Sequence, residues 1–416
     1  MGSHKGAWEP EIDCIKLPQI GIFGMKLNKQ FKLSCLAVAG LNTVSVPSVA
    51  ENTETTVKGG GITFQQGDTK FQIGGRLQWD YDYFDGVHNE GQSGSGTELR
   101  RGRFYAKGTL SKEWEAKLQV QFDDKTEKAQ WKDMYAKYKG WEGIDLTIGK
   151  IKEPFGLEVV NSSKYITFIE RTMASEAFGP ERSHGITLFS NKGHATFAGG
   201  VYVEGENENN RETYAGTARI TYAPIMANDS VIHFGLAGSL RDMDGSDYQI
   251  NERAEVHQAD QIVKSGTTVA DNVTLLGLEA AALFGSFSIQ TEYIRAAVKA
   301  VPYSGYFDAD YYGYYIQADY FLTGEYRPYK NGIFKGSIKP RSTSGAWLLA
   351  ARFSHLDADD NHKGVKVNNI TLGINHYVNS QIRISANYIM TNVEGSDAYP
   401  NEDNGDTISL RFQYIF

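Results

Sequence analysis

The feature that most constrains the fold of this chain is an alternation of apolar and polar side chains with a period of two residues. In residues 113–123, for example, Trp114, Leu118 and Phe122 fall on one face, and Glu115 and Lys117 fall on the other. A period of two is typical of a β-strand, because successive side chains point to opposite faces. Sixteen segments carry this pattern: 71–84, 97–110, 113–123, 131–139, 143–150, 184–190, 194–203, 212–223, 230–241, 272–283, 286–297, 310–323, 345–356, 366–377, 381–392 and 405–416.

The connections between these segments differ systematically in length. Tight turns lie at 111–112, 140–143, 191–193, 285–286 and 378–380, and longer runs rich in Gly, Asn, Asp and Ser lie at 85–96, 242–271, 324–344, 357–365 and 393–404. Short turns at one end and long loops at the other are typical of bacterial outer-membrane barrels. We therefore predict an all-β fold, a 16-stranded antiparallel transmembrane β-barrel. A soluble β-sandwich is the alternative, but its outer face would not be apolar on nearly every strand.

Residues 25–50 have the features of a secretory signal peptide. Lys26, Lys29 and Lys32 precede an apolar run at 33–46, and residues 48–50 offer a small-residue cleavage site. We predict cleavage after Ala50 and localisation in the bacterial outer membrane. A membrane anchor is the alternative, but the run is short and lacks a basic stop-transfer flank. Residues 1–24 are interpreted as a misassigned start or an artefact, residues 51–70 as a leader, and residues 71–416 as the barrel domain.

Cysteine content and charge exclude several classes of protein. Cys14 and Cys35 both precede the predicted cleavage site, so the exported chain has no disulfide framework and no cysteine metal site. The net charge of −8 argues against nucleic acid as a partner. An outer-membrane enzyme is a further alternative, but His184, His194 and His233 are isolated, and no nucleophile motif or metal-spaced histidine cluster appears. We predict no catalytic activity, no cofactor and no metal.

The inner faces of the predicted strands carry more basic than acidic residues. A barrel of about sixteen strands is too wide for side chains to fill, so its polar face lines water. The basic residues in this phase are Arg76, Arg101, Arg103, Lys107, Lys117, Lys137, Arg219, Arg352, Arg383 and Arg411, and the acidic ones are Asp80, Asp82, Glu115, Asp133 and Glu292. Lumen charges set the field that a permeating ion crosses, so we predict a preference for anions. In the alternative, these cations only pair with lumen carboxylates.

Residues 151–183 interrupt the alternation with a long irregular segment. Long segments without regular structure inside a compact domain are usually functional. This is the third long connection, after 85–96 and 124–130, and in porins the third long loop folds into the barrel and narrows it. Ser162, Ser163, Lys164 and Arg171 offer hydroxyl and cationic donors suited to a phosphate-like anion. A surface loop without contact to the lumen is the alternative.

The chain resembles the phosphate-selective porins of the O and P type. The resemblance covers most of the mature chain and is carried by "FQIGGRLQWDYDYF", "ELRRGRFYAKGTL", "WKDMYAKYKG", "IGKIKEPFGLE" and "NSSKYITFIER". It implies a homotrimer in outer-membrane lipid and lipopolysaccharide, with an anion site at a constriction formed by the third loop. By motif, it implies that this site includes Arg76, Arg100, Arg101, Asp133, Ser162, Ser163 and Arg171.

Two features depart from the family pattern. A family lysine in the third loop corresponds to Val159, and the closely spaced arginine ladder is absent, with Arg219 isolated. Arg100 is out of phase with the lumen in the predicted register, so either a β-bulge or a different register is needed there. The predicted function is passive diffusion of small anions, including phosphate or polyphosphate. A general porin of low selectivity is the alternative, and the long loops could also serve as an adhesin or phage receptor. The terminal Phe416 resembles the C-terminal aromatic signature of outer-membrane proteins.

Overall fold

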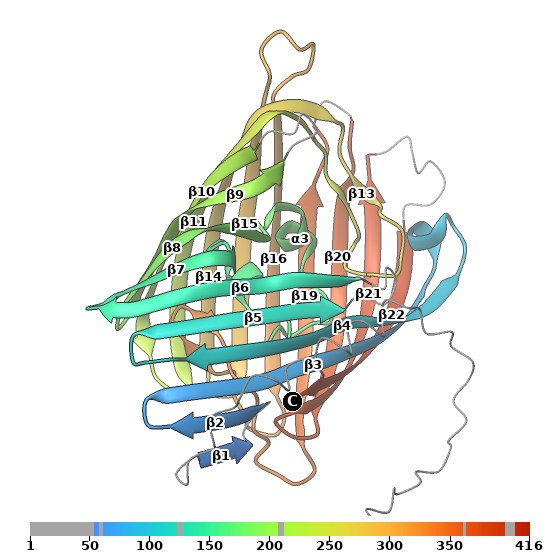
Figure 1. Cartoon of the computed structure of the whole chain (residues 1–416). Helices are drawn as coiled ribbons and strands as arrows, with labels where there is room; N and C mark the ends of the chain where they lie inside the picture. Colours follow the sequence, from blue (N-terminus) through green and yellow to red (C-terminus); the bar gives the residue numbers. More distant parts are fainter. Residues whose placement is uncertain (1–53, 58–60, 123–127, 207–211, 361–362, 396–403) are drawn as a thin grey trace, which may run out of the picture. The chain divides into compact units, whose positions relative to one another are not determined.

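Sixteen strands form a closed antiparallel barrel (Figure 1). The computed structural model describes residues 54–57, 61–122, 128–206, 212–360, 363–395 and 404–416, so the predicted signal peptide lies outside the described residues. The barrel strands are β3 (Thr69–Phe84), β4 (Gly94–Thr109), β5 (Trp114–Phe122), β6 (Ala129–Trp141), β7 (Ile144–Lys152), β8 (Arg182–Lys192), β9 (Ala195–Glu206), β10 (Glu212–Met226), β11 (Ser230–Tyr248), β14 (Thr268–Phe284), β15 (Phe287–Ala300), β16 (Ala309–Phe321), β19 (Ala346–Asp357), β20 (Lys366–Tyr377), β21 (Ile382–Glu394) and β22 (Asn404–Ile415). All sixteen predicted segments are confirmed.

The last strand closes the barrel against the first. β22 pairs with β3 in antiparallel register, with Arg411 opposite Asp80, so no strand edge of the wall faces lipid. Beyond the strand, the Gly75 N–H donates to the Phe416 carbonyl at 2.6 Å. A Cβ on Gly75 would lie 2.6 Å from the Phe416 ring, so glycine is needed for this close approach.

The two faces of the wall differ as the alternation predicts. On β22, Ile408, Leu410 and Phe412 are 46%, 43% and 42% exposed, while Arg411 and Gln413 are 1% and 2% exposed. Large apolar side chains are exposed on every strand of the barrel wall. A continuous apolar outer surface of this extent is suited to lipid rather than water. None of the helices in the described part of the chain is long and apolar enough to cross a membrane.

The described residues also form several short strands and helices besides the sixteen wall strands. β1 (Glu54–Val57) and β2 (Ile62–Gln66) lie in the predicted leader, where the sequence indicated no strand. β2 folds back onto β3 through Gly67, whose φ of 56° favours glycine, and pairs with Thr69–Ile73 below the point where β22 ends. The other short elements are η2 (Gly86–Asn89), α2 (Leu157–Val160), α3 (Met173–Phe178), β12 (Asn251–Glu252), β13 (Val263–Lys264), β17 (Tyr329–Lys330) and β18 (Ile333–Phe334).

The connection between β16 and β19 corrects one prediction. Residues 324–344 were grouped with the long loops, but strand order places this connection at the end of the tight turns, which faces the periplasm in such barrels. It folds inward rather than outward. The Gly332 carbonyl accepts a hydrogen bond from Arg219 Nη2 at 2.9 Å, and the Tyr329 hydroxyl lies 2.7 Å from His233 Nδ1. The length of this connection does not show at which end of the barrel it lies, but the number of strands that precede it does.

A β-bulge on β4 brings Arg100 into the lumen. Gln78 pairs with Arg101 and Asp80 pairs with Glu98, so two residues of β4 lie opposite Trp79 alone. This β-bulge explains how Arg100 reaches the lumen although the alternation alone would point it outward. As a result, two consecutive arginines both reach the interior.

Candidate functional site: the pore constriction

Residues 153–181, called loop 3 below, enter the barrel between β7 and β8 and reach its far wall. The backbone N–H groups of Leu157 and Glu158 donate to the Glu292 carboxylate on β15 at 2.6 and 2.7 Å. Glu292 also accepts a hydrogen bond from the Tyr315 hydroxyl on β16. A carboxylate on free N–H groups at the start of a helical turn satisfies donors that have no partner within the helix. Loop 3 is therefore anchored at α2.

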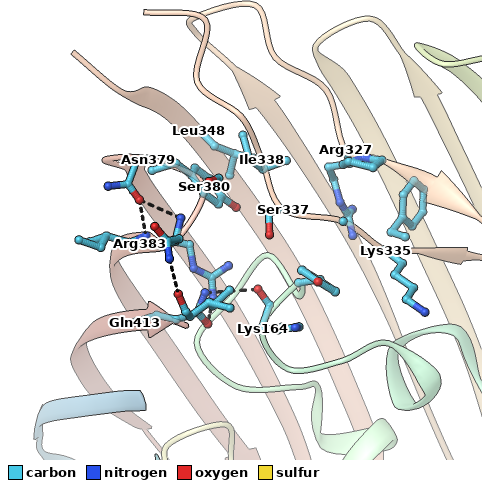
Figure 2. Close-up of a pocket in the computed structure, with 18 of the residues that line it drawn as sticks. Lys164, Arg327, Lys335, Ser337, Ile338, Leu348, Asn379, Ser380, Arg383 and Gln413 are labelled. Carbon is cyan, nitrogen blue, oxygen red and sulfur yellow. Dashed lines mark hydrogen bonds between the residues drawn. The ribbon is translucent and has the colours of Figure 1, made fainter. Parts of the chain in front are cut away.

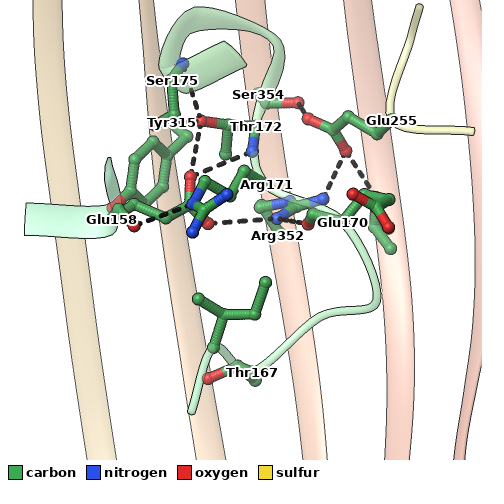
Figure 3. Close-up of polar contacts among 12 residues, drawn as sticks. Glu158, Thr167, Glu170, Arg171, Thr172, Ser175, Glu255, Tyr315, Arg352 and Ser354 are labelled. Carbon is green, nitrogen blue, oxygen red and sulfur yellow. Dashed lines mark hydrogen bonds and ion pairs between the residues drawn. The ribbon is translucent and has the colours of Figure 1, made fainter. Parts of the chain in front are cut away.

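The second half of loop 3 is held by its backbone carbonyls. Four side chains of the far wall donate to them: Asn375 to Thr167, Arg352 to Glu170, Arg383 to Ile166 and Arg411 to Ile169. Figure 3 shows Arg352 between Glu158, Glu170 and Glu255, with Ser354 bonded to Glu255. Since β19, β20, β21 and β22 all contribute, loop 3 spans the lumen and the predicted constriction is present.

One carboxylate of loop 3 binds three arginines. Glu170 contacts Arg100 at 2.9 Å, Arg101 at 3.1 Å and Arg411 at 2.7 Å. Burial alone would raise the pKa of Glu170, but these three positive charges outweigh it and hold the pKa well below its usual range. Arg411 is also paired with Asp80 at 2.5 Å. Arg100 and Arg101 thus hold loop 3 to the seam of β3, β4 and β22.

A second group of cations, called the basic cluster, comes from β3, β4, β5, β7, β8 and loop 3. Its members are Arg76, Arg103, Lys117, Lys152, Lys164, Arg171 and Arg182. Arg76 is close enough to Arg101, Arg171 and Arg182 to be repelled by their charges. Arg76 Nη1 donates to Ser162 Oγ at 2.8 Å. The cluster therefore joins the wall strands to the serine pair of loop 3.

Acidic residues neutralise only part of the basic cluster. Asp133 binds both Lys117 and Arg182 at 2.5 Å, and Glu176 binds Arg171 at 3.1 Å. The other four cations, Arg76, Arg103, Lys152 and Lys164, form no ion pair with any described residue. Two of these cations have their contacts inside the protein: Arg103 donates to Gln121 and Lys152 to the Val159 carbonyl. The cluster thus keeps an excess of positive charge.

Two buried donors of this region have no partner in the described structure. They are Arg76 Nε and Ser163 Oγ, and the two residues are 5% and 2% exposed. Buried polar atoms are normally hydrogen-bonded, so unpartnered ones call for a ligand or water. Lys164 is half-buried beside them, and burial together with the charges of Arg76, Lys117 and Lys335 lowers its pKa to about 8.

The remaining predicted pore-lining cations point inward and are paired. Lys107 contacts Glu115 at 3.1 Å, Lys137 contacts Asp145 at 3.7 Å, Arg219 contacts Glu279 at 2.6 Å and Arg352 contacts Glu255 at 2.5 Å. At these four positions the alternative interpretation applies, in which lumen cations only pair with lumen carboxylates. Arg383 is the exception, since no described carboxylate pairs with it.

The sequence reasoning missed several residues of the site. Lys152 and Arg182 are the last and first residues of β7 and β8, where the chain leaves the wall and alternation no longer predicts direction. Glu170 was missed because it lies in an irregular segment. The sequence signal that could have identified Lys152 and Arg182 is that these two cations lie directly before and after loop 3. Arg171 was predicted to bind an anion, yet it donates to the carbonyls of Glu158 and Asn161 and braces loop 3.

Two of the histidines that the sequence singles out have partners within the barrel. His233 is buried, with Tyr329 and Glu279 as its partners, and His194 Nδ1 lies 2.6 Å from the Ala223 carbonyl. Among the described residues, no group of three or more His, Cys, Asp or Glu side chains is arranged to hold a metal ion.

A sixteen-stranded barrel narrowed by an inward loop and lined by unpaired cations defines an outer-membrane porin. Its sequence supports a narrower assignment. The chain belongs to the family described as phosphate-selective porin O and P, whose sequence model matches residues 71–416. Porin O of Pseudomonas aeruginosa is 28% identical over 92% of this chain and 96% of its own length.

Solved structures share the fold at low sequence identity. An anion-selective porin from Comamonas acidovorans aligns with a TM-score of 0.55 at 12% identity, over 84% of this chain and all of its own. The outer-membrane channel DcaP of Acinetobacter baumannii aligns with a TM-score of 0.56 at 10% identity, over 85% of this chain and 99% of its own. The predicted family and barrel are confirmed.

Proposed function

We propose that this porin lets small anions, including phosphate or polyphosphate, diffuse passively through its lumen. Selection takes place where they pass the basic cluster. The observation that carries the proposal is that Arg76, Arg103, Lys152 and Lys164 form no ion pair with a described residue. Fixed positive charge at a narrow point attracts anions and repels cations without a chemical step, so no enzymatic activity is included.

The proposal distinguishes two roles among the residues that the sequence assigned to one site. Arg76, Ser162 and Ser163 contact the permeating anion, because Arg76 Nε and Ser163 Oγ are buried without a partner. Arg100 and Arg101 position loop 3 through Glu170 and do not contact the anion. Asp133 orients Lys117 and Arg182.

Lys152 supplies charge that Val159 does not. The Lys152 ammonium donates to the backbone carbonyl of Val159, so a cation lies at the place in loop 3 where the apolar side chain departs from the family pattern. The proposal therefore keeps phosphate among the solutes despite Val159. A lysine held by a carbonyl has two further N–H groups to offer.

Planar-bilayer recordings of the purified porin test the proposal. In a KCl gradient, we expect a reversal potential of the sign that anion selectivity gives, and added phosphate should reduce the chloride current. Lys152→Gln should raise the phosphate concentration needed for half block at least about tenfold, about 1.4 kcal/mol. Lys192→Gln, at the exposed end of β8, is the matched control and should change neither value.

Cation selectivity of the unmodified porin would refute the proposal. Anion selectivity without phosphate block would instead establish a general porin of low selectivity. A normal phosphate block in Lys152→Gln would show that Lys152 has no part in the site.

We also propose that the porin works as a homotrimer embedded in outer-membrane lipid and lipopolysaccharide. OmpT of Vibrio cholerae, which shares the fold with a TM-score of 0.51, has been solved in a trimer form. Chemical cross-linking in outer-membrane vesicles followed by denaturing electrophoresis should give a ladder that ends at three subunits. A ladder that ends at one subunit would contradict the trimer.

A further inference from the structure

Arg383 on β21 is a buried cation without a counter-charge. Its side chain is among the largest that are fully buried, and no described carboxylate pairs with it. Nη1 donates to the Ile166 carbonyl at 2.8 Å, Nη2 donates to Gln413 Oε1 at 3.4 Å, and Nε has no partner. An unpaired buried charge is costly, so such a group normally has an anion beside it.

The neighbouring strand offers a direct comparison. Arg411 on β22 is 1% exposed and equally deep in the wall, but it contacts both Asp80 and Glu170. Two buried arginines on adjacent strands thus differ in one respect, namely that one has carboxylate partners and the other has none.

A cavity lies beside Arg383 (Figure 2). It is bounded by the tip of loop 3 at Lys164 and Tyr165, by the inward turn at 327–338 and by the turn between β20 and β21. Its volume is about 30 Å³. This is room for about two water molecules, or for one small anion.

The cavity lining has one sign of charge. Lys164, Arg327, Lys335 and Arg383 contribute cations, and no Asp or Glu is among the lining residues. Arg327 is neutralised from outside the cavity by Asp319 at 3.2 Å. Figure 2 shows the side chain of Lys335 directed away from the cavity, and Arg383 is the most deeply buried cation of the lining.

The rest of the lining is largely apolar or neutral. Aromatic and aliphatic side chains come from Tyr165, Phe334, Ile338, Leu348, Ile382 and Tyr377, and the Ser337 hydroxyl points into the space. Thr167, Asn379, Ser380, Gln381 and Gln413 add neutral polar groups to the lining. Since Arg327 is already paired, the buried guanidinium of Arg383 leaves one positive charge to be neutralised, which a single negative charge can do. The cavity therefore suits a singly charged, weakly hydrated anion.

We propose that this cavity binds one small monovalent anion of the halide, nitrate or thiocyanate class against Arg383. Lys164 borders both this cavity and the basic cluster, but Arg383, which binds the anion here, is not a member of that cluster, and the site does not depend on which solute permeates the pore. Its occupant neutralises the guanidinium that holds the Ile166 carbonyl, and so it stabilises the tip of loop 3 against the inward turn.

Crystals of the porin soaked in bromide test the site directly through anomalous scattering. We expect a bromide peak in the cavity next to Arg383 and no peak next to Arg411, which serves as an internal control within the same crystal. The absence of a peak at Arg383, with bromide ordered elsewhere, would overturn the proposal. Equal peaks at both arginines would also overturn it, because binding would then follow any arginine.

Calorimetric titration of the detergent-solubilised porin with thiocyanate gives a second test. Arg383→Gln should abolish the binding heat of this site, and Ser337→Leu should do the same by filling the cavity while the charge stays. Arg295→Gln, an exposed arginine paired with Asp310, is the control and should bind as the unmodified porin does. Unchanged binding in Ser337→Leu would overturn the proposal even if Arg383→Gln failed to fold. Phosphate block should persist in Ser337→Leu, which separates this site from the basic cluster.

Discussion

At the scale of single residues, the position of loop 3 depends on Glu170. Its carboxylate is shared by Arg100, Arg101 and Arg411, so the substitution Glu170→Gln leaves buried positive charge without a partner. Breaking a buried pair from one side costs about 3–5 kcal/mol. We expect larger and noisier single-channel currents, and unfolding of the porin at lower temperature in gel-shift assays.

Glu142→Gln is the matched control for Glu170→Gln, because Glu142 is exposed in a tight turn. It should leave both currents and heat resistance unchanged. If Glu170→Gln behaved like this control, loop 3 would be held by its backbone contacts alone.

Lys164 makes the selectivity of the pore dependent on pH. Its folded pKa of about 8 lies below the ordinary value of a lysine, so the ammonium loses its proton as the pH rises through 8. We expect anion selectivity, measured as reversal potential in a KCl gradient, to fall between pH 7 and pH 9. Burial is the main cause of the downward shift of the Lys164 pKa, and the nearby charges of Arg76, Lys117 and Lys335, which are all positive, add to it.

Lys164→Arg keeps its charge over this range and should show no such fall. A fall of equal size in Lys164→Arg would assign the titration to another group.

At the scale of elements, the inward turn between β16 and β19 narrows the periplasmic end. The hairpin of β17 and β18 begins and ends at neighbouring points, since the Lys335 N–H donates to the Pro328 carbonyl at 2.8 Å. Deletion of residues 329–334 therefore joins ends that already meet. We expect a higher single-channel conductance with the barrel intact, because the hairpin reaches Arg219 and His233 in the lumen.

Heat resistance and the β-sheet signal of circular dichroism serve as controls for this deletion. Unchanged conductance in a folded deletion variant would show that the hairpin does not obstruct the current path.

The strands of this porin could be predicted from sequence far better than its interior. Alternation fixed the sixteen wall strands because lipid on one side and water on the other impose a strict period of two. Loop 3 and the inward turn follow no such period, so Glu170 and Arg327 could not be paired with their partners in advance. The direction of Arg76 and Arg411 followed from the pattern, whereas the counter-charges of Arg411 come from β3, far along the chain, and from the irregular loop 3.

At the scale of the whole molecule, export should remove the predicted signal peptide. N-terminal sequencing of the porin isolated from outer membranes should begin at Glu51, after the small residues at 48–50. Replacement of Ala50 by a bulky residue, Ala50→Trp, should leave a larger, unprocessed form. A start at another position would relocate the cleavage site, and a start at Met25 would contradict export through a cleaved signal.

The contacts of Glu170 impose an order of events on assembly. Arg100 and Arg101 come from the second wall strand, and Arg411 comes from the sixteenth, which is the last to be synthesised. Glu170 can therefore gain all three of its arginine partners only after β22 has been synthesised and the seam between β22 and β3 has closed. A barrel without β22 would have an open wall, and Glu170 of loop 3 would lack Arg411 as a partner. The wall and the constriction are therefore completed in the same step.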